Sequence, residues 1–176
     1  KNVAGNSSGG VGISNSVNIT IESSEFVANE VLSGSGGALF ASDLSAILVR
    51  NTSLEQNYAA KAGGAAFVGP FVSNVSFVDV RWQKNRAGGR GGALYVIGST
   101  HVDVNDNSFS GNCAQTGSGS ALYVRGTLLA MCSNDFSGNE AAGGGTVFWA
   151  HASGMDEPVG LQTCGNDFDD SNAAGY

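Results

Sequence analysis

Apolar and polar positions along this chain repeat with a period of 27 to 28 residues. In each period a bulky apolar residue is followed about three positions later by a small polar one, as Phe26 is by Asn29. The polar positions are Asn29, Asn57, Asn85, Asn112, Asn139 and, less cleanly, Asn172, which step by 28, 28, 27, 27 and 33 residues. A nearly constant step of this size indicates a repeat protein whose similar coils stack on one another.

Alternating apolar positions before each bulky residue predict one β-strand per coil. The positions seven and five residues before it are apolar in nearly every coil, as Ile19 and Ile21 are before Phe26. The residue between them is mostly polar or small, and such alternation places one set of side chains on one face of a strand. Frequent glycine argues against helices, because each glycine weakens a helix by about 1 kcal/mol.

A glycine block and a second apolar segment follow in each coil. The blocks are Gly36-Gly37-Ala38, Gly63-Gly64-Ala65, Gly91-Gly92-Ala93, Gly119-Ser120-Ala121 and Gly144-Gly145-Thr146. Behind them run an aliphatic column (Leu39, Ala66, Leu94, Leu122, Val147) and an aromatic column (Phe40, Phe67, Tyr95, Tyr123, Phe148). Only one column can face the core. We expect the aliphatic one, because tyrosine hydroxyls lie better near water, although Gly12 and Ile13 of the first coil favour the reverse.

These patterns predict an all-β fold, a parallel β-helix (solenoid) of about six coils with a pectin-lyase-like architecture. Residues 1–176 are expected to form a single segment of a longer repeat array. The general preference of parallel strand connections favours a right-handed coil. The bulky residue fills the core, and the Asn residues stack into a ladder at the turn, where Asn also tolerates a left-handed backbone. The glycine pair serves another corner, with positive φ or a close backbone contact.

The combination of Gly-Gly-Ala and Phe-x-x-Asn, paired in five successive coils, resembles the repeat of the polymorphic outer membrane proteins, found in chlamydiae and in large algal and other eukaryotic surface proteins. The resemblance covers essentially the whole chain. The chain departs from the family's pattern at Leu54, Trp82, Ser120 and Thr146. The resemblance implies a right-handed parallel β-helix, an adhesin-like role at a cell surface and no catalytic residues.

Composition narrows the possible partners. The net charge is −7 and only 13% of the residues are charged, whereas nucleic-acid phosphates and anionic membrane surfaces attract basic proteins. No apolar run is long enough to span a bilayer. We therefore expect no nucleic acid, no direct membrane insertion and no cofactor.

The three cysteines allow one disulfide. Cys132 and Cys164 each lie four residues before the bulky position, which places them side by side in adjacent coils. A disulfide between them implies an oxidising compartment. Two alternatives stay open: Cys113 pairs with one of them, or all three are small space-filling residues. The spacing lacks the paired-cysteine pattern of zinc sites, so we expect no metal.

Four Asn residues begin N-glycosylation sequons: Asn6, Asn18, Asn51 and Asn74. They are the glycan candidates if the chain passes through a eukaryotic secretory route.

Acidic residues recur in register. Asp79 and Asp106 share one register, and Asp135 and Asp167 share another. Parallel β-helices that cleave acidic polysaccharides use such columns for calcium or as paired acid and base. A solvated acidic face is the alternative that we favour.

Two histidines and an insertion complete the candidates. His101 and His151 have no Ser or Cys partner at a motif spacing. Residues 152–158, after His151, lengthen the last coil and predict a protruding loop.

The sequence therefore predicts a non-enzymatic extracellular structural or adhesion module, a rigid segment of a large cell-surface or extracellular-assembly protein. Its expected partners are adjacent coils of the same longer chain, other surface-assembly proteins or carbohydrate. The alternative is a polysaccharide-active β-helix enzyme of the pectate-lyase type. That alternative requires the acidic columns to face a groove that also contains Arg or Lys.

Overall fold

The computed structural model describes residues 1–99, 101–126, 128–143, 148–151, 160–169 and 172–174. It is an all-β parallel solenoid of about five turns, and the described residues contain no helix. The sequence predicts about six coils.

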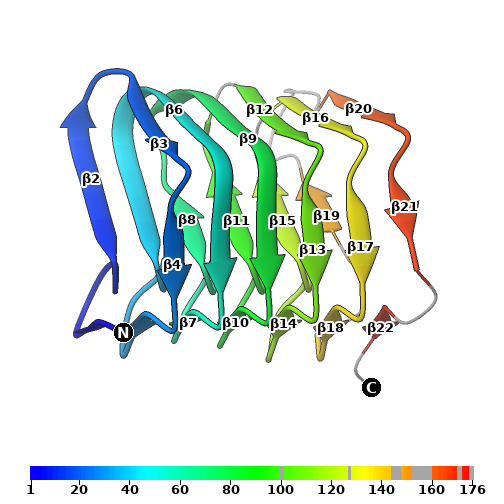
Figure 1. Ribbon diagram of the computed structural model, residues 1–176, viewed down its shortest axis with the longest axis horizontal. Coiled ribbons are helices and arrows are strands. Elements are labelled where there is room, and N and C mark those ends of the chain that lie inside the picture. Colours follow the sequence, from blue (N-terminus) through cyan, green and yellow to red (C-terminus); the bar gives the residue numbers. More distant parts are fainter. Residues whose placement is uncertain (100, 127, 144–147, 152–159, 170–171, 175–176) are drawn as a thin grey trace.

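Each coil presents four strand faces, numbered here in chain order. Face 1 is a seven-stranded parallel sheet at the bottom of Figure 1. Its strands are β1 (Val3–Ala4), β5 (Glu30–Val31), β7 (Tyr58–Ala59), β10 (Arg86–Ala87), β14 (Cys113–Ala114), β18 (Glu140–Ala141) and β22 (Ala173–Ala174). Face 2, on the distant side in Figure 1, consists of β2 (Val11–Ser16), the start of β6 (Leu39–Glu55), β8 (Ala66–Val68), β11 (Leu94–Ile97), β15 (Leu122–Arg125) and β19 (Phe148–His151).

Faces 3 and 4 complete the coil, and the long strands β6 and β9 bend from one onto the other. Face 3, at the top of Figure 1, consists of β3 (Ile19–Glu22), the middle of β6, the start of β9 (Val72–Gln83), β12 (His101–Asn105), β16 (Leu128–Cys132) and β20 (Leu161–Cys164). Face 4, nearest the viewer, consists of β4 (Glu25–Val27), the ends of β6 and β9, β13 (Ser108–Ser110), β17 (Asp135–Ser137) and β21 (Asp167–Phe168).

The coil is right-handed. In Figure 1 the chain rises on the distant face 2, crosses face 3 toward the viewer and descends on face 4, while it advances from left to right. All strand pairs are parallel, and equivalent residues of neighbouring coils align, as Val75, Val102 and Leu129 do. This is the hand that parallel strand connections prefer.

The bulky residue fills the core in the four inner periods. Leu54, Trp82, Phe109 and Phe136 are at most 1% exposed. The rings of Trp82, Phe109 and Phe136 stack along the axis, with centroids 5.5 and 4.9 Å apart. Stacked aromatic rings at the spacing of the coils bury large apolar areas without a gap between layers.

The aliphatic column of face 2 points inward, as predicted. Leu39, Ala66, Leu94 and Leu122 are at most 1% exposed and belong to the core. The aromatic column points outward, where its rings stack at centroid distances of 4.9 to 5.2 Å. Because the rings cover one another, Tyr95 and Tyr123 are only 8% and 5% exposed.

The predicted columns are wrong by one residue in the last coil. Leu122 pairs with Phe148, and Tyr123 pairs with Trp149. Phe148 therefore continues the aliphatic column and not the aromatic one. Alignment on the glycine block fails here because Phe148 lies four residues after Gly144, whereas Leu122 lies three residues after Gly119. The block Gly144-Gly145-Thr146 and Val147 lie outside the described residues.

The repeated Asn residues form a ladder at the corner between faces 4 and 1. Asn85 shows the pattern: its Nδ2 donates to Leu54 O (2.7 Å) in the previous coil and to Asn112 Oδ1 (3.1 Å) in the next. Its own Oδ1 accepts from the backbone N–H and the Nδ2 of Asn57, both at 3.0 Å. The ladder runs through Asn2, Asn29, Asn57, Asn85, Asn112, Asn139 and Asn172.

The left-handed backbone at this corner lies one residue before the Asn in five successive coils, not at the Asn as predicted. Ala28, Gln56 and Lys84 have φ values of 54°, 55° and 52°, and Gly111 and Gly138 continue the column. The Asn residues are therefore required for their hydrogen bonds and not for their tolerance of positive φ.

The glycine blocks serve the corner between faces 1 and 2, for both expected reasons. Gly63 and Gly91 have φ values of +62° and +63°. A Cβ at Gly64 would lie 2.0 Å from the carbonyl oxygen of Gly92 in the next coil. The first glycine of the pair thus permits the turn and the second permits the close stacking of coils.

Replacement of a ladder Asn is expected to destabilise the solenoid strongly. Asn85→Ala removes the side-chain hydrogen bonds to Leu54 O and Asn112 Oδ1 and takes the acceptor away from the buried backbone N–H of Asn57, which costs about 2–4 kcal/mol in the free energy of unfolding. Chemical denaturation measures the change. The matched control is Asn74→Ala, because Asn74 is exposed and surface substitutions change stability by about 0.5 kcal/mol or less. Equal effects of the two substitutions would contradict the role of the ladder.

Candidate functional site

A polar groove of about 480 Å³ follows the corner between faces 3 and 4 across several coils. Hydroxyl, amide, carboxylate and guanidinium groups line it together. Its exposed residues include Ser23, Asn51, Asp79, Arg81 and Asp106. We call it the corner groove.

The backbone explains which residue types line the corner groove. Ser23, Asn51, Asp79 and Asp106 occupy equivalent positions of successive coils, with φ values of 49°, 47°, 53° and 57°. Short polar side chains tolerate this left-handed conformation because they hydrogen-bond locally. The predicted shared register of Asp79 and Asp106 therefore has a structural cause in the turn itself.

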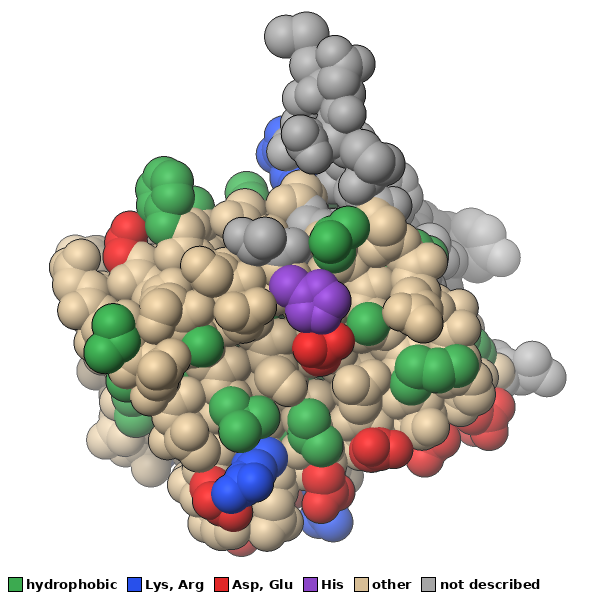
Figure 2. Space-filling view, turned by 90° about the horizontal axis from the view of Figure 1, so that it is seen from above, with side chains coloured by type: hydrophobic (Ala, Val, Ile, Leu, Met, Phe, Trp, Pro, Cys, Tyr) green, Lys and Arg blue, Asp and Glu red, His purple; other side chains and the backbone are tan. Residues whose placement is uncertain are grey.

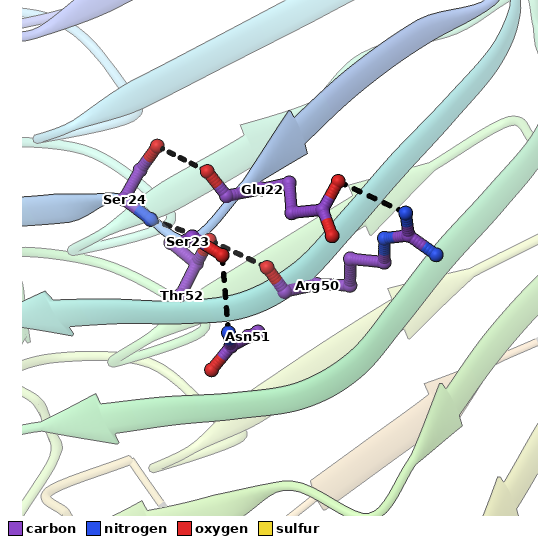
Figure 3. A network of polar contacts seen from close by, with 6 residues as sticks. All are labelled: Glu22, Ser23, Ser24, Arg50, Asn51 and Thr52. Atoms are coloured by element: carbon purple, nitrogen blue, oxygen red, sulfur yellow. Dashed lines mark hydrogen bonds and ion pairs between the residues drawn. The ribbon is translucent and has the colours of Figure 1, made fainter.

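A second hydrogen-bonded ladder runs on the inner side of the same corner. Thr52 Oγ1 accepts from the backbone N–H of Ser24 (3.4 Å) and donates to Arg50 O (2.9 Å), as Figure 3 shows. Further along, the Nδ2 of Asn107 donates to Asn134 Oδ1 (3.1 Å), and that of Asn134 donates to Asn166 Oδ1 (2.8 Å).

The sequence analysis missed this second ladder. Its only signal is an Asn two positions before the bulky residue in the last three coils, at Asn107, Asn134 and Asn166. In earlier coils the position holds Ser24, Thr52 and Val80, so no single residue type marks the column. Asn107 Oδ1 also accepts from the backbone N–H of Val80 (3.1 Å). The ladder therefore provides a hydrogen-bond partner for the backbone even in the coil where the position holds an apolar residue.

The charges of the corner groove are open to solvent. Arg81 is 67% exposed and approaches Glu55 at 4.0 Å. Arg50 binds Glu22 at 2.9 Å beside the groove (Figure 3). Asp79 and Asp106 have no ion pair within 4.0 Å among the described residues. The groove can therefore bind hydroxyl-rich or cationic groups, and it combines carboxylates with Arg as the enzymatic alternative requires.

The other acidic pair lies outside the corner groove. Asp135 pairs in register with Asp167 on face 4, as predicted, and both are exposed. In the part of the chain that the structure describes, no three His, Cys, Asp or Glu side chains gather closely enough to hold a metal ion. The arrangement is that of a solvated acidic face.

A disulfide joins Cys132 of β16 to Cys164 of β20, with the Cα atoms 4.5 Å apart. The two strands pair directly on face 3, as the shared register predicts. The bond ties the last coil to the rest of the solenoid. Cys113 is free and half-buried on face 1, where burial and the nearby Glu140 raise the pKa of its thiol.

All four sequon Asn residues are exposed: Asn6, Asn18, Asn51 and Asn74. The buried Asn residues of the two ladders carry no sequon. The Nδ2 of Asn51 donates to Ser23 Oγ (3.1 Å) at the rim of the corner groove. The chain thus separates structural Asn residues from those that a glycan can reach.

The histidines are not part of the groove. His101 Nε2 lies 3.1 Å from Asp103 Oδ1 on face 3, and both side chains are partly exposed. The side chain of His151 and the predicted loop at 152–158 lie outside the described residues.

Figure 2 looks onto face 3 and shows mostly uncharged surface. Acidic side chains lie mainly along its lower edge, and hydrophobic side chains are scattered singly. Among the described residues, no helix is long and apolar enough to cross a membrane. Comparisons with protein-family models, with curated proteins and with solved structures find no match to this chain.

Removal of the disulfide is expected to destabilise the solenoid. Cys132 and Cys164 are 32 residues apart, and a loop of this length restricts the unfolded chain by about 3–4 kcal/mol in the chain-entropy model. The double substitution Cys132→Ser and Cys164→Ser should therefore lower the melting temperature, measured by circular dichroism. Reducing agent should lower that of the unsubstituted chain but not that of the double variant. Cys113→Ser is the control, and a larger effect of this control would contradict the assignment.

Proposed function

We propose that this chain is a non-enzymatic structural and adhesion module of a cell-surface or extracellular protein. We further propose that its coils are repeats of the polymorphic outer membrane protein type. The observation that carries the proposal is the uniform stack, in which the polar groups that enter the core bind the next coil along the axis. Such a stack supplies length, rigidity and broad polar sides.

Two observations support an extracellular location. The disulfide is typical of oxidising compartments. The exposure of all four sequon residues fits a glycoprotein.

The two ends of the stack support an assembly role. Residues equivalent to the core columns are exposed at both ends, with Val11 at 37%, Leu161 at 49% and Phe168 at 46%. Strands at the ends of the described sheets can pair with further strands. We propose further coils of a longer chain, or other surface-assembly proteins, as the partners.

Secretion tests the extracellular assignment. Expressed through a eukaryotic secretory route, the chain is expected to leave the cell folded, with Cys132 bonded to Cys164 and with glycans on Asn6, Asn18, Asn51 and Asn74. Peptide mapping before and after enzymatic deglycosylation measures both. A chain that is retained, or secreted with free thiols and no glycan, contradicts the assignment.

Mass spectrometry of the native protein tests the scaffold role. Peptides from flanking sequence should reveal further coils or a surface anchor. A flanking catalytic domain that acts on the same material would overturn the non-enzymatic assignment.

A polysaccharide-active enzyme is the second candidate, because Asp79, Asp106 and Arg81 share the corner groove. Incubation with a panel of acidic and neutral polysaccharides, followed by measurement of new chain ends, separates the two. Our proposal expects no cleavage. Cleavage that disappears in Asp79→Asn with Asp106→Asn, but persists in Arg50→Gln, would establish the enzyme instead.

A further inference from the structure

A second hollow lies at the corner between faces 1 and 2, opposite the corner groove. It has a volume of about 470 Å³, and its functional lining comes from Lys61, Arg90, Tyr95 and Thr116 over a floor of glycines. We call it the Arg90 hollow. Ligand sites are typically concave spaces of a few hundred Å³ or more with a small number of convergent polar groups.

Arg90 is held in place by the outward aromatic column. Its guanidinium carbon lies 5.4 Å from the centre of the Tyr123 ring. It also lies near enough to the Tyr95 hydroxyl to act against the rise in the pKa of that group. A guanidinium fixed over an aromatic face keeps a planar fork of donors that matches carboxylate and sulfate geometry.

The glycine floor makes room for this arrangement. A Cβ at Gly117 would lie 2.5 Å from the Cγ of Arg90. Any larger residue at this position would therefore displace the Arg90 side chain. Thr116, which also lines the hollow, donates its Oγ1 hydrogen to Gly88 O (2.7 Å), so its oxygen can still accept a hydrogen bond.

The hollow is electropositive in an acidic protein. Lys61 and Arg90 are exposed and have no ion pair within 4.0 Å among the described residues, whereas Arg50 and Arg81 have acid partners. The positive charge of Arg125 also acts to lower the pKa of the Tyr95 hydroxyl. An anion placed here meets two unneutralised cations from adjacent coils.

Tyr95 adds a neutral donor. Burial, and secondarily the neighbouring Tyr123, raise the pKa of its hydroxyl above the usual value in spite of Arg90 and Arg125. The hydroxyl therefore stays protonated at neutral pH and can donate to a ligand oxygen.

We propose that the Arg90 hollow binds the carboxylate or sulfate group of an acidic polysaccharide. Arg90 and Lys61 pair with the anionic group, and Tyr95 and Thr116 face the sugar hydroxyls. The volume exceeds the need of a small free anion and suits one sugar unit. The net charge of −7 opposes broad polyanion binding. This proposal names a ligand for the adhesive part of the proposed function and rests on that function.

Binding of purified secreted chain to immobilised polysaccharides tests the proposal. Polygalacturonate and a sulfated glycan such as heparin should bind, with affinity that falls as salt rises, and neutral dextran should not. Arg90→Gln is expected to weaken binding about tenfold, as loss of one charge-assisted contact does. Lys61→Gln should weaken it in the same direction. The affinity of Arg90→Lys should lie between those of the unsubstituted chain and Arg90→Gln, because lysine keeps the charge but lacks the planar fork of donors.

A matched control separates this hollow from general charge effects. Arg50→Gln removes one exposed charge beside the corner between faces 3 and 4 and should leave binding unchanged. Equal losses in all three glutamine variants, or equal binding of dextran, would overturn the proposal. Anionic lipid vesicles that bind in place of the polysaccharides would also overturn it.

Two further readouts keep the outcome interpretable. Melting curves show whether Arg90→Gln remains folded, and Lys61→Gln tests the hollow without touching the aromatic column. Inorganic sulfate that competes as well as the polymers at equal sulfate concentration would show that no sugar is recognised. Failure of binding leaves the secretion and flanking-sequence results unaffected, so the scaffold proposal is judged separately.

Discussion

The whole structure depends on hydrogen bonding between equivalent residues of successive coils. A solenoid core is a narrow column, so polar groups at each corner are close to it and must find partners. Backbone groups pair between parallel strands, and the Asn side chains at the corner between faces 4 and 1 pair with the next coil. Steps of 28, 27 and 33 residues all bring an Asn into the ladder, so the requirement fixes the position of this corner and not the length of the coil. The stacked rings of Trp82, Phe109 and Phe136 obey the same constraint in the core.

The fold could be read from the sequence where one residue type occupies one position in every coil. The bulky residue and the following Asn are such a pair, and the structure places both in columns. The second ladder could not be read in this way, because Ser24, Thr52 and Asn107 share a role but no residue type. The left-handed corner positions, such as Gln56 and Lys84, escaped for the same reason. Trp149 shows the other limit, because alignment on the glycine block fails where the spacing between the block and the strand changes.

The two concave surfaces illustrate how a repeat backbone produces different chemistry at different corners. At the corner groove, the left-handed turn selects short polar residues, and two of these are aspartates. The acidic register was visible in the sequence, but the presence of Arg81 beside it was not. At the Arg90 hollow, Lys61 and Arg90 occupy different positions of the period and meet only because adjacent coils stack. An alignment of the coils therefore does not place Lys61 and Arg90 in one column.

The Asn ladder also gives the solenoid a direction. Each Asn donates its side-chain N–H to the Asn of the next coil toward the C-terminus, and the link between Asn2 and Asn29 already points this way. The carboxamide oxygen of Asn2 therefore lies at one end of the described ladder, whereas that of Asn172 at the other end already accepts from Asn139. A coil that continued this ladder would have to join head to tail, so the asymmetry of one amide group gives the stack its polarity.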